Sequence, residues 1–406
     1  MGTRKAPERH GEQRRREFRE EKQRRRRWLA TARREGRVPD GRGLEHSIRV
    51  LPRPAPELRA EALASGRATR TSLATSYRAV TRSVVVSTVQ EDMPDEFRVR
   101  PEDCGAFVLD AVTRARAHWM RNTASVVGFW AAAAFHGLPY WCDDAPVVLL
   151  RDASSRGDAR SWVAAETLRT PVFRRLRPGT PTVCPDPAFP GLRVVGAAVS
   201  AGQCLHSIMN GTHGWDVPDV PGLTCREVRA VQFIDAVYQC TRLTADDIRR
   251  GARHYVHRRT VRRLLGWADT GAQSPRETLL RLYTRDCLPA GHTWTSQVTV
   301  LLDPEGRPWK HLVADLACEE LQVALFYDGS YHRAEERRGI DFGQVHRLRA
   351  LDWESVRVGA ALMADVPQMT DDVDEAVDRA MRRVDALAEA AAEAASETAA
   401  DDPSVV

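Results

Sequence analysis

The chain has 406 residues, of which 43% are hydrophobic and 28% are charged, and its formal net charge is +5. The length suffices for two or three domains with a substantial core, and the composition excludes a wholly disordered chain. The longest apolar run, residues 126–135, is about half of the roughly 20 residues that span a membrane, and the first residues lack the apolar core of a signal peptide. We therefore expect a soluble, cytoplasmic protein without a membrane partner.

The charges are unevenly distributed along the chain. Residues 1–36 carry 14 Lys/Arg against 6 Asp/Glu, whereas residues 366–406 carry 3 Arg against 11 Asp/Glu. We expect residues 1–37 to form a basic, partly disordered arm suited to a polyanion such as DNA, with a solvated charged tail as the alternative. Residues 366–406 are rich in alanine and predict one helix followed by a disordered tail.

The eight cysteines lie at irregular spacings, at positions 104, 142, 184, 204, 225, 240, 287 and 318. No two of them form the close Cys-x-x-Cys pair that is typical of a zinc site. In a chain without a secretory signal, this pattern predicts reduced, buried thiols.

The predicted elements begin with a degenerate winged helix in residues 38–92. Its helices are expected at residues 54–64 and 71–80, and its strand at residues 84–86. A mixed α/β domain is expected over residues 93–268, with helices at 122–135, 226–240 and 246–268, the last broken near Gly251, and strands at 146–150 and 193–199.

The last compact unit is predicted over residues 269–365. A helix opens at Ser274-Pro275 and runs to about residue 287. Strands are expected at residues 295–302, 310–318 and 321–328, then a helix over 332–352 interrupted near Gly339, then a strand at 354–358. The order is α-β-β-β-α-β, and the whole chain is predicted to be an α/β protein of several domains.

Two acids stand out in this unit. Asp315 lies inside an apolar run, and a second apolar run ends in Phe326-Tyr327-Asp328. If the two runs are adjacent strands, both carboxylates reach one end of the sheet, where hard oxygen ligands can hold Mg²⁺ against a phosphate. A turn or ion pair is the alternative for Asp315, and an Asp-Gly turn is the alternative for Asp328.

Several motifs of the last unit resemble those of a group of actinobacterial proteins that carry a domain related to the very-short-patch repair (Vsr-like) endonucleases of the PD-(D/E)xK superfamily. The motifs are Ser274-Pro275-x-Glu277-x-x-x-Arg281, Asp303-x-x-Gly306, Asp315-Leu316-Ala317, Tyr327-Asp328-Gly329-x-x-His332 and the spaced residues Asp341, Leu348, Trp353 and Arg357. Upstream, the segment from Ala132 to Leu138 is similar to one in AbiEi-type antitoxins. The resemblance implies a restriction-endonuclease-like fold for the last unit and an antitoxin-like central region.

The resemblance also suggests roles for further side chains. Glu277 is the helix-borne acid that would complete a metal site with Asp315 and Asp328, although Ser274 and Glu277 also have the spacing of a capping box. His332 is a candidate for a general base or for positioning a water, and Asp341 for orienting His332 or for an ion pair. The candidate phosphate contacts are Arg281, Arg337, Arg338 and Arg347, with a solvated helix face as the alternative.

These observations lead to two functional hypotheses of different kinds. The first is a DNA-binding, Mg²⁺-dependent endonuclease. The second is an AbiEi-like antitoxin or transcriptional regulator, acting with a cognate toxin, in which the nuclease fold has lost its catalytic power. Phe326, which stands where the related proteins usually have glutamate, and the missing lysine of the superfamily pattern favour the second. A protein that binds only other proteins is a third hypothesis.

Overall fold

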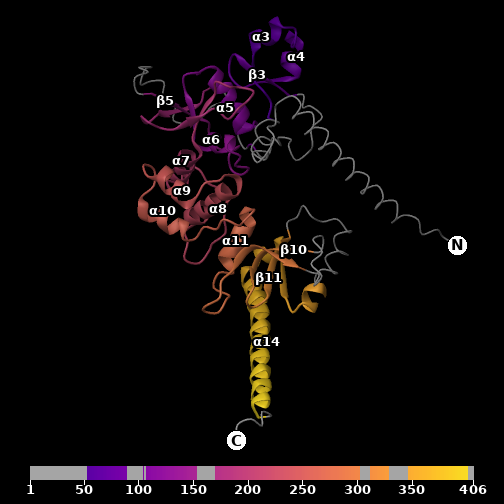
Figure 1. Ribbon diagram of the computed structural model, residues 1–406. Coiled ribbons are helices and arrows are strands. Elements are labelled where there is room, and N and C mark those ends of the chain that lie inside the picture. The colour runs from indigo at the N-terminus through magenta and orange to yellow at the C-terminus, as the bar shows by residue number, and fades with distance from the viewer. Residues whose placement is uncertain are drawn as a thin grey trace, which may run out of the picture. The chain divides into compact units, whose positions relative to one another are not determined.

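The structure, a computed structural model, describes residues 53–88, 104, 107–152, 170–301, 311–328 and 346–400 (Figure 1). The chain divides into two compact units. The first comprises Met1–Asp216 and Cys240–Arg263, and the second comprises Val217–Gln239 and Leu264–Val406. The predicted basic arm at residues 1–37 lies outside the described residues.

The first unit begins with two short helices and a small antiparallel sheet. The elements are β1 (Glu57–Leu58), α3 (Arg59–Ala64), α4 (Arg70–Thr75), β2 (Tyr77–Ala79) and β3 (Val84–Ser87), in the strand order β1-β3-β2. Both predicted helices are present but shorter than expected: the first begins at Arg59 after the strand β1, and the second ends at Thr75, before the strand β2. The hairpin that follows is closed by the Val80 amide, which donates to the carbonyl of Val84 at 3.0 Å. The side chains of Val84 and Val86 are buried and form the apolar face of this sheet.

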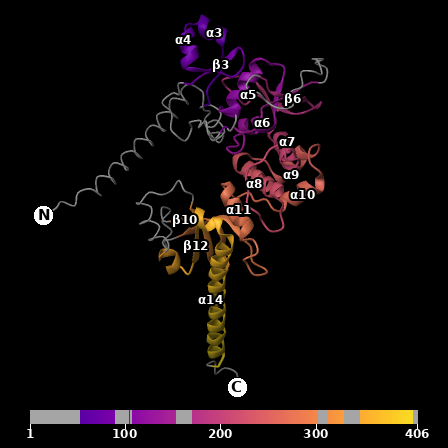
Figure 2. The same cartoon turned by 180° about the vertical axis from the view of Figure 1, so that it is seen from behind.

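A five-stranded mixed sheet forms the rest of the first unit with its helices. Its order is β6-β5-β4-β8-β7, and its members are β4 (Val126–Gly128), β5 (Val148–Arg151), β6 (Val172–Arg175), β7 (Thr182–Val183) and β8 (Arg193–Val195). The helices are α5 (Ala111–Met120), α6 (Phe129–Phe135), α7 (Ala197–Met209), α9 (Ala245–Ala252) and α10 (Arg258–Leu265). Figure 2 shows the same elements from behind.

The sequence prediction failed at two junctions of this sheet. A single helix was expected over residues 122–135, but Val126 and Val127 form the central strand β4, because fully buried β-branched side chains pair with β5 on one side and β8 on the other. The strand expected at residues 193–199 ends at Val195, and α7 follows. The helix predicted over 246–268 is two helices, α9 and α10, and Gly251 lies inside the first of them, where α7 approaches too closely for any side chain.

The second unit contains a four-stranded sheet in the order β12-β11-β10-β9. Its elements are α8 (Cys225–Cys240), α11 (Pro275–Tyr283), β9 (Thr295–Leu301), β10 (His311–Cys318), β11 (Val323–Asp328), β12 (Glu354–Gly359), α13 (Ala360–Ala364) and α14 (Val366–Ala400). Strand β10 is antiparallel to both of its neighbours, β9 and β11, whereas β12 runs parallel to β11. The four predicted strands are confirmed. The predicted helix at 332–352 is described only from residue 346 and is helical over 346–350.

The core of the second unit lies against this sheet. It consists of Val298, Val300, Ala314, Ala317, Ala324, Phe326 and Leu348, with Leu312, Leu351 and Trp353 packed beside it. The predicted C-terminal helix is confirmed as α14, whose buried residues Met369, Val373, Ala376, Val377 and Ala380 recur at the three-to-four-residue spacing of a helix face. The sequence placed a boundary near residue 268, whereas α8 groups with the second unit. One contact that joins it to that unit is the ion pair between Asp235 of α8 and Arg281 of α11.

Two further expectations concerned the burial of the cysteines and the hydropathy of the helices. All eight cysteines are free thiols, but Cys184 and Cys225 are exposed, so the expectation of uniformly buried thiols was wrong. Within the described ranges, no helix combines the length and the apolar character needed to cross a bilayer.

Candidate functional site

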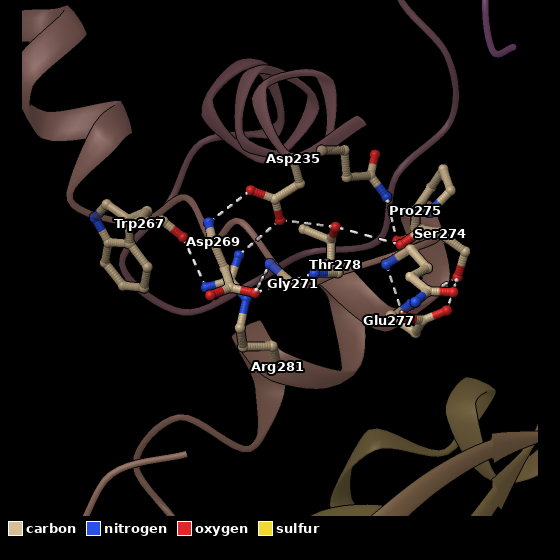
Figure 3. Close-up of polar contacts among 12 residues, drawn as sticks. Asp235, Trp267, Asp269, Gly271, Ser274, Pro275, Glu277, Thr278 and Arg281 are labelled. Carbon is tan, nitrogen blue, oxygen red and sulfur yellow. Dashed lines mark hydrogen bonds and ion pairs between the residues drawn. The ribbon is translucent and has the colours of Figure 1, made fainter. Parts of the chain in front are cut away.

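The first predicted acid, Glu277, lies in the opening turn of α11. The Ser274 hydroxyl caps the helix by accepting the Glu277 amide at 3.2 Å, and it donates to Oε1 of Glu277 at 2.9 Å (Figure 3). Oε2 accepts the backbone amide of Gln273 at 2.8 Å. The helix cap by Ser274 is therefore confirmed, but the full capping box is not, because the Glu277 carboxylate accepts the Gln273 amide instead of the Ser274 amide. These contacts fix the carboxylate in one orientation.

The second predicted acid, Asp315, lies in the middle of β10 and meets Glu277 through a shared amide. Its Oδ2 accepts the backbone amide of Tyr327 from β11 at 2.6 Å. The amide nitrogen Nε2 of Gln297 donates to Oδ1 of Asp315 at 3.4 Å and to Oε2 of Glu277 at 3.1 Å. The fold thus brings a helix-borne acid and a strand-borne acid to one side-chain amide. We call these three residues the acid pair and its bridging amide.

The bridging amide stands on an unusual backbone. Gln297 has a φ of 57°, in the left-handed region that residues other than glycine rarely adopt. It lies across from Asp315, between the paired positions Ser296–Leu316 and Val298–Ala314. Such a conformation costs on the order of 1–3 kcal/mol, and such conformations cluster at functional sites. The β9–β10 pairing is therefore locally distorted at the position that faces the acid.

Burial raises the pKa of both acids. For Glu277 the loss of hydration is the largest cause, and the charge of Asp315 adds to it, while the Gln273 amide opposes it. For Asp315 burial is again the largest cause, the Tyr327 amide opposes it, and the charge of Asp328 raises the pKa further. Two half-buried carboxylates with raised pKa values form a local concentration of negative charge that a cation would relieve.

The third predicted ligand, Asp328, is placed differently. It ends β11, its side chain is 50% exposed, and its Oδ2 lies 3.5 Å from Nη1 of Arg357 on β12. Phe326, at the position where the resemblance expects glutamate, is 6% exposed and belongs to the hydrophobic core. Of the three predicted metal ligands, the structure therefore brings Glu277 and Asp315 together and pairs Asp328 with an arginine.

One predicted phosphate contact, Arg281, is turned inward. Its Nη2 donates to Oδ2 of the fully buried Asp235 at 2.8 Å, and its Nη1 donates to the carbonyl of Trp267 at 2.7 Å (Figure 3). Thr278 also donates to Asp235, at 2.9 Å. The structure corrects the prediction for Arg281, because its guanidinium is used to compensate a buried carboxylate.

The other predicted residues are less constrained. Arg347 is exposed and remains a candidate contact. His332, Arg337, Arg338 and Asp341 lie outside the described residues.

Sequence analysis missed an arginine-rich surface in the first unit. The helices α9 and α10 and the turn between them expose seven arginines on one segment, namely Arg249, Arg250, Arg253, Arg258, Arg259, Arg262 and Arg263. Arg249 and Arg250 are ion-paired with Asp246 and Asp247, while Ile248 and Val261 are buried. We call the seven residues the α9–α10 arginine face. The repeat of arginine pairs at four-residue spacing was a signal that helix periodicity could have detected.

Sequence analysis also missed a cluster of nitrogen, sulfur and oxygen donors in the second unit. One potential ligand atom from each of His292, Cys318 and Glu320 lies within 4.8 Å of the other two. The spacing of the cysteines does not indicate this cluster, because it contains a single cysteine and its histidine comes from another segment.

The comparisons with known proteins do not place the chain in a family. No family model, curated protein or solved structure matches it. We therefore infer function from the geometry of the side chains.

Proposed function

We propose that the protein binds DNA in the cytoplasm and that its second unit hydrolyses phosphodiester bonds with Mg²⁺. The observation that carries the proposal is the acid pair and its bridging amide, in which Glu277 of α11 and Asp315 of β10 share Nε2 of Gln297. The order α11-β9-β10-β11-β12 and the mixed sheet are consistent with the nuclease fold that the sequence motifs suggest.

The donors present fit a magnesium ion. Mg²⁺ prefers oxygen ligands and is usually held by one or two carboxylates, with waters and phosphate oxygens completing its coordination. Glu277 and Asp315 supply two such carboxylates, each with one oxygen anchored by a backbone amide. When bound, Mg²⁺ would polarise the scissile phosphate and lower the pKa of a water. The Gln273 and Tyr327 amides hold the carboxylates in place. The carboxylate oxygens that accept from Nε2 of Gln297 would bind the cation in place of that amide.

The α9–α10 arginine face supports the DNA-binding part of the proposal. Arg258 and Arg262 lie one helical turn apart on α10, as do Arg259 and Arg263, and all four are exposed. Parallel rows of guanidinium groups suit phosphate oxygens, which arginine contacts in a bidentate manner. Such contacts release counterions from DNA, so binding should weaken steeply as salt is added.

A second candidate function follows from Phe326 and Asp328. Phe326 fills the core in place of the expected acid, and Asp328 faces Arg357 at 3.5 Å. These two features favour an AbiEi-like antitoxin or regulator that keeps the nuclease fold, binds DNA and acts with a cognate toxin, but has lost hydrolysis. The two candidates share DNA binding and differ in catalysis.

The test is nicking of supercoiled plasmid by the full chain with Mg²⁺ or Mn²⁺. We expect Asp315→Asn and Glu277→Gln each to reduce nicking at least about 100-fold, since loss of an outer-shell partner of a metal alone can cost that much. Glutamine at position 277 retains the capping contact with Ser274. The matched control is Glu319→Gln, which removes the same charge from an exposed position beside β10 and should leave nicking unchanged.

The DNA-binding part of the proposal is tested by the salt dependence of the affinity for duplex DNA. Arg258→Gln with Arg262→Gln should reduce the magnitude of the negative slope of log affinity against log salt by about 1.8, since each phosphate contact contributes about 0.9. The control removes two exposed arginines elsewhere in the first unit, Arg121 and Arg193. Salt-sensitive binding without any metal-dependent nicking would select the regulator, and the absence of both would reject the two candidates together.

A further inference from the structure

The cluster of His292, Cys318 and Glu320 is built by two separate segments of the second unit, a loop and the end of a strand with its following turn. His292 lies in the loop between α11 and β9, Cys318 is the last residue of β10, and Glu320 lies in the turn between β10 and β11. Their candidate ligand atoms, one nitrogen, one sulfur and one carboxylate oxygen, all lie within 4.8 Å of one another. The cluster shares no residue with the acid pair and its bridging amide.

One buried polar atom of the cluster has no partner in the described part of the protein. Nδ1 of His292 is buried and has no hydrogen-bond partner among the residues that the structure describes. Cys318 is fully buried, and its Sγ contacts Oε2 of Glu320 at 3.3 Å. A buried polar atom without a partner is uncommon in folded proteins, and an ion is one of the ordinary explanations.

The donor set is suited to zinc and poorly suited to magnesium. Zn²⁺ binds thiolate sulfur at about 2.3 Å, imidazole nitrogen at about 2.0 Å and carboxylate oxygen at about 2.0–2.2 Å. In a tetrahedral site such ligand atoms lie roughly 3.3–3.6 Å apart. The Cys318–Glu320 pair already has this separation, and a ring nitrogen of His292 lies within 4.8 Å of both ligand atoms. Magnesium, in contrast, prefers oxygen donors throughout.

We propose that His292, Cys318 and Glu320 bind a zinc ion, with the fourth position taken by water or by a ligand from outside the cluster. Binding converts the Cys318 thiol to a thiolate, and its proton is released to solvent. The ion links the α11–β9 loop to the β10–β11 turn. This turn lies at the end of the sheet where β11 begins, opposite the end where Asp328 lies. Its function is independent of the hydrolytic activity proposed above.

The direct test measures zinc binding to the full chain by titration calorimetry with ZnCl₂ and by metal analysis after dialysis. We expect one equivalent in the wild type. Glu320→Gln and His292→Ala should each weaken binding at least about 100-fold, a loss larger than the 10–100-fold typical of outer-shell changes. Glu319→Gln is the matched control, because Glu319 and Glu320 are adjacent and both exposed. Since Glu320 is exposed, its substitution should not impair folding.

A spectroscopic test identifies the sulfur ligand. Co²⁺ in place of zinc should give a thiolate-to-cobalt charge-transfer band that disappears in Cys318→Ser and persists in Cys287→Ser. Glu277→Gln and Asp315→Asn should retain zinc with unchanged affinity, which separates this proposal from that of the magnesium site. The proposal is overturned if the wild type retains no zinc, or if Glu320→Gln and Glu319→Gln bind it equally.

Discussion

The helix α11 contacts two groups of carboxylates whose pKa values are both raised by burial but whose partners differ. In one, Asp235 is fully buried and receives hydrogen bonds from Thr278, from Arg281 and from the Asp269 amide. In the other, Glu277 and Asp315 are half-buried and share the Gln297 amide. Among the described residues, no basic side chain is ion-paired with either member of the second group.

The comparison shows why burial alone does not identify a catalytic acid. Burial raises the pKa of Asp235 to about 6 even though Arg281 opposes it, and burial also raises the pKa values of Glu277 and Asp315. The first group is compensated within the fold, and its charges are structural. The second group carries two negative charges whose hydrogen-bond donors are all neutral, so a bound cation would stabilise it.

The largest expected effect concerns the compensated group. Arg281→Met leaves Asp235 buried without its cation and should lower the free energy of unfolding by about 3–5 kcal/mol, measured by urea denaturation. The double variant Asp235→Asn with Arg281→Met removes both charges and should recover most of the loss. A single variant within about 1 kcal/mol of the wild type would contradict the assigned role, because it would fall in the range of exposed ion pairs.

The next effect is a pH dependence that Asp235 imposes on stability. Its folded pKa of about 6 exceeds the ordinary value of 3.8, so the unfolded chain releases this proton first as the pH rises. The contribution is present below pH 3.8 and is lost as the pH rises through about 6, with a size on the order of 2–3 kcal/mol. Denaturation curves across this range should show the decline in the wild type and a reduced decline in Asp235→Asn. Equal declines would refute the assignment.

A comparable effect should appear when Mg²⁺ is added. Ligand at 100 times its dissociation constant stabilises a folded protein by about 2.7 kcal/mol, so the melting temperature of the wild type should rise with the ion. Asp315→Asn should abolish the rise, whereas Asp235→Asn should retain it. Because burial raises the pKa values of both acids, the rise should diminish as the pH falls and protons compete with the cation. A rise that persists in Asp315→Asn would place the ion elsewhere.

The smallest effect concerns the bridging residue. Gln297→Ala and Gln297→Gly both remove the shared amide, but only glycine adopts the positive φ without steric cost. The glycine variant should therefore be more stable than the alanine variant by about 1 kcal/mol in urea denaturation. If alanine were the more stable of the two, the left-handed backbone at this position would be excluded.

Local features of the second unit were predictable from the sequence. The helix start at Ser274 and Pro275 was found because a cap depends on neighbouring residues, and β9 and β10 were found because their side chains alternate. The start of β4 at Val126 was not predicted, because a short buried strand is distinguished from a buried helix only by its partner strands, here β5 and β8. The inward turn of Arg281 was missed for the same reason, since its partner Asp235 lies 46 residues away.

The amino-acid sequence by itself determined where most helices and strands lie in the second unit and which acids deserved attention, because capping, alternation and charge are properties of short segments. Only the tertiary structure decided that Glu277 and Asp315 both accept from Gln297 and that Arg281 is ion-paired with Asp235. It also decided that His292 lies beside Cys318 and Glu320. Each of these contacts joins residues from different elements, and their distances depend on how helix and sheet pack.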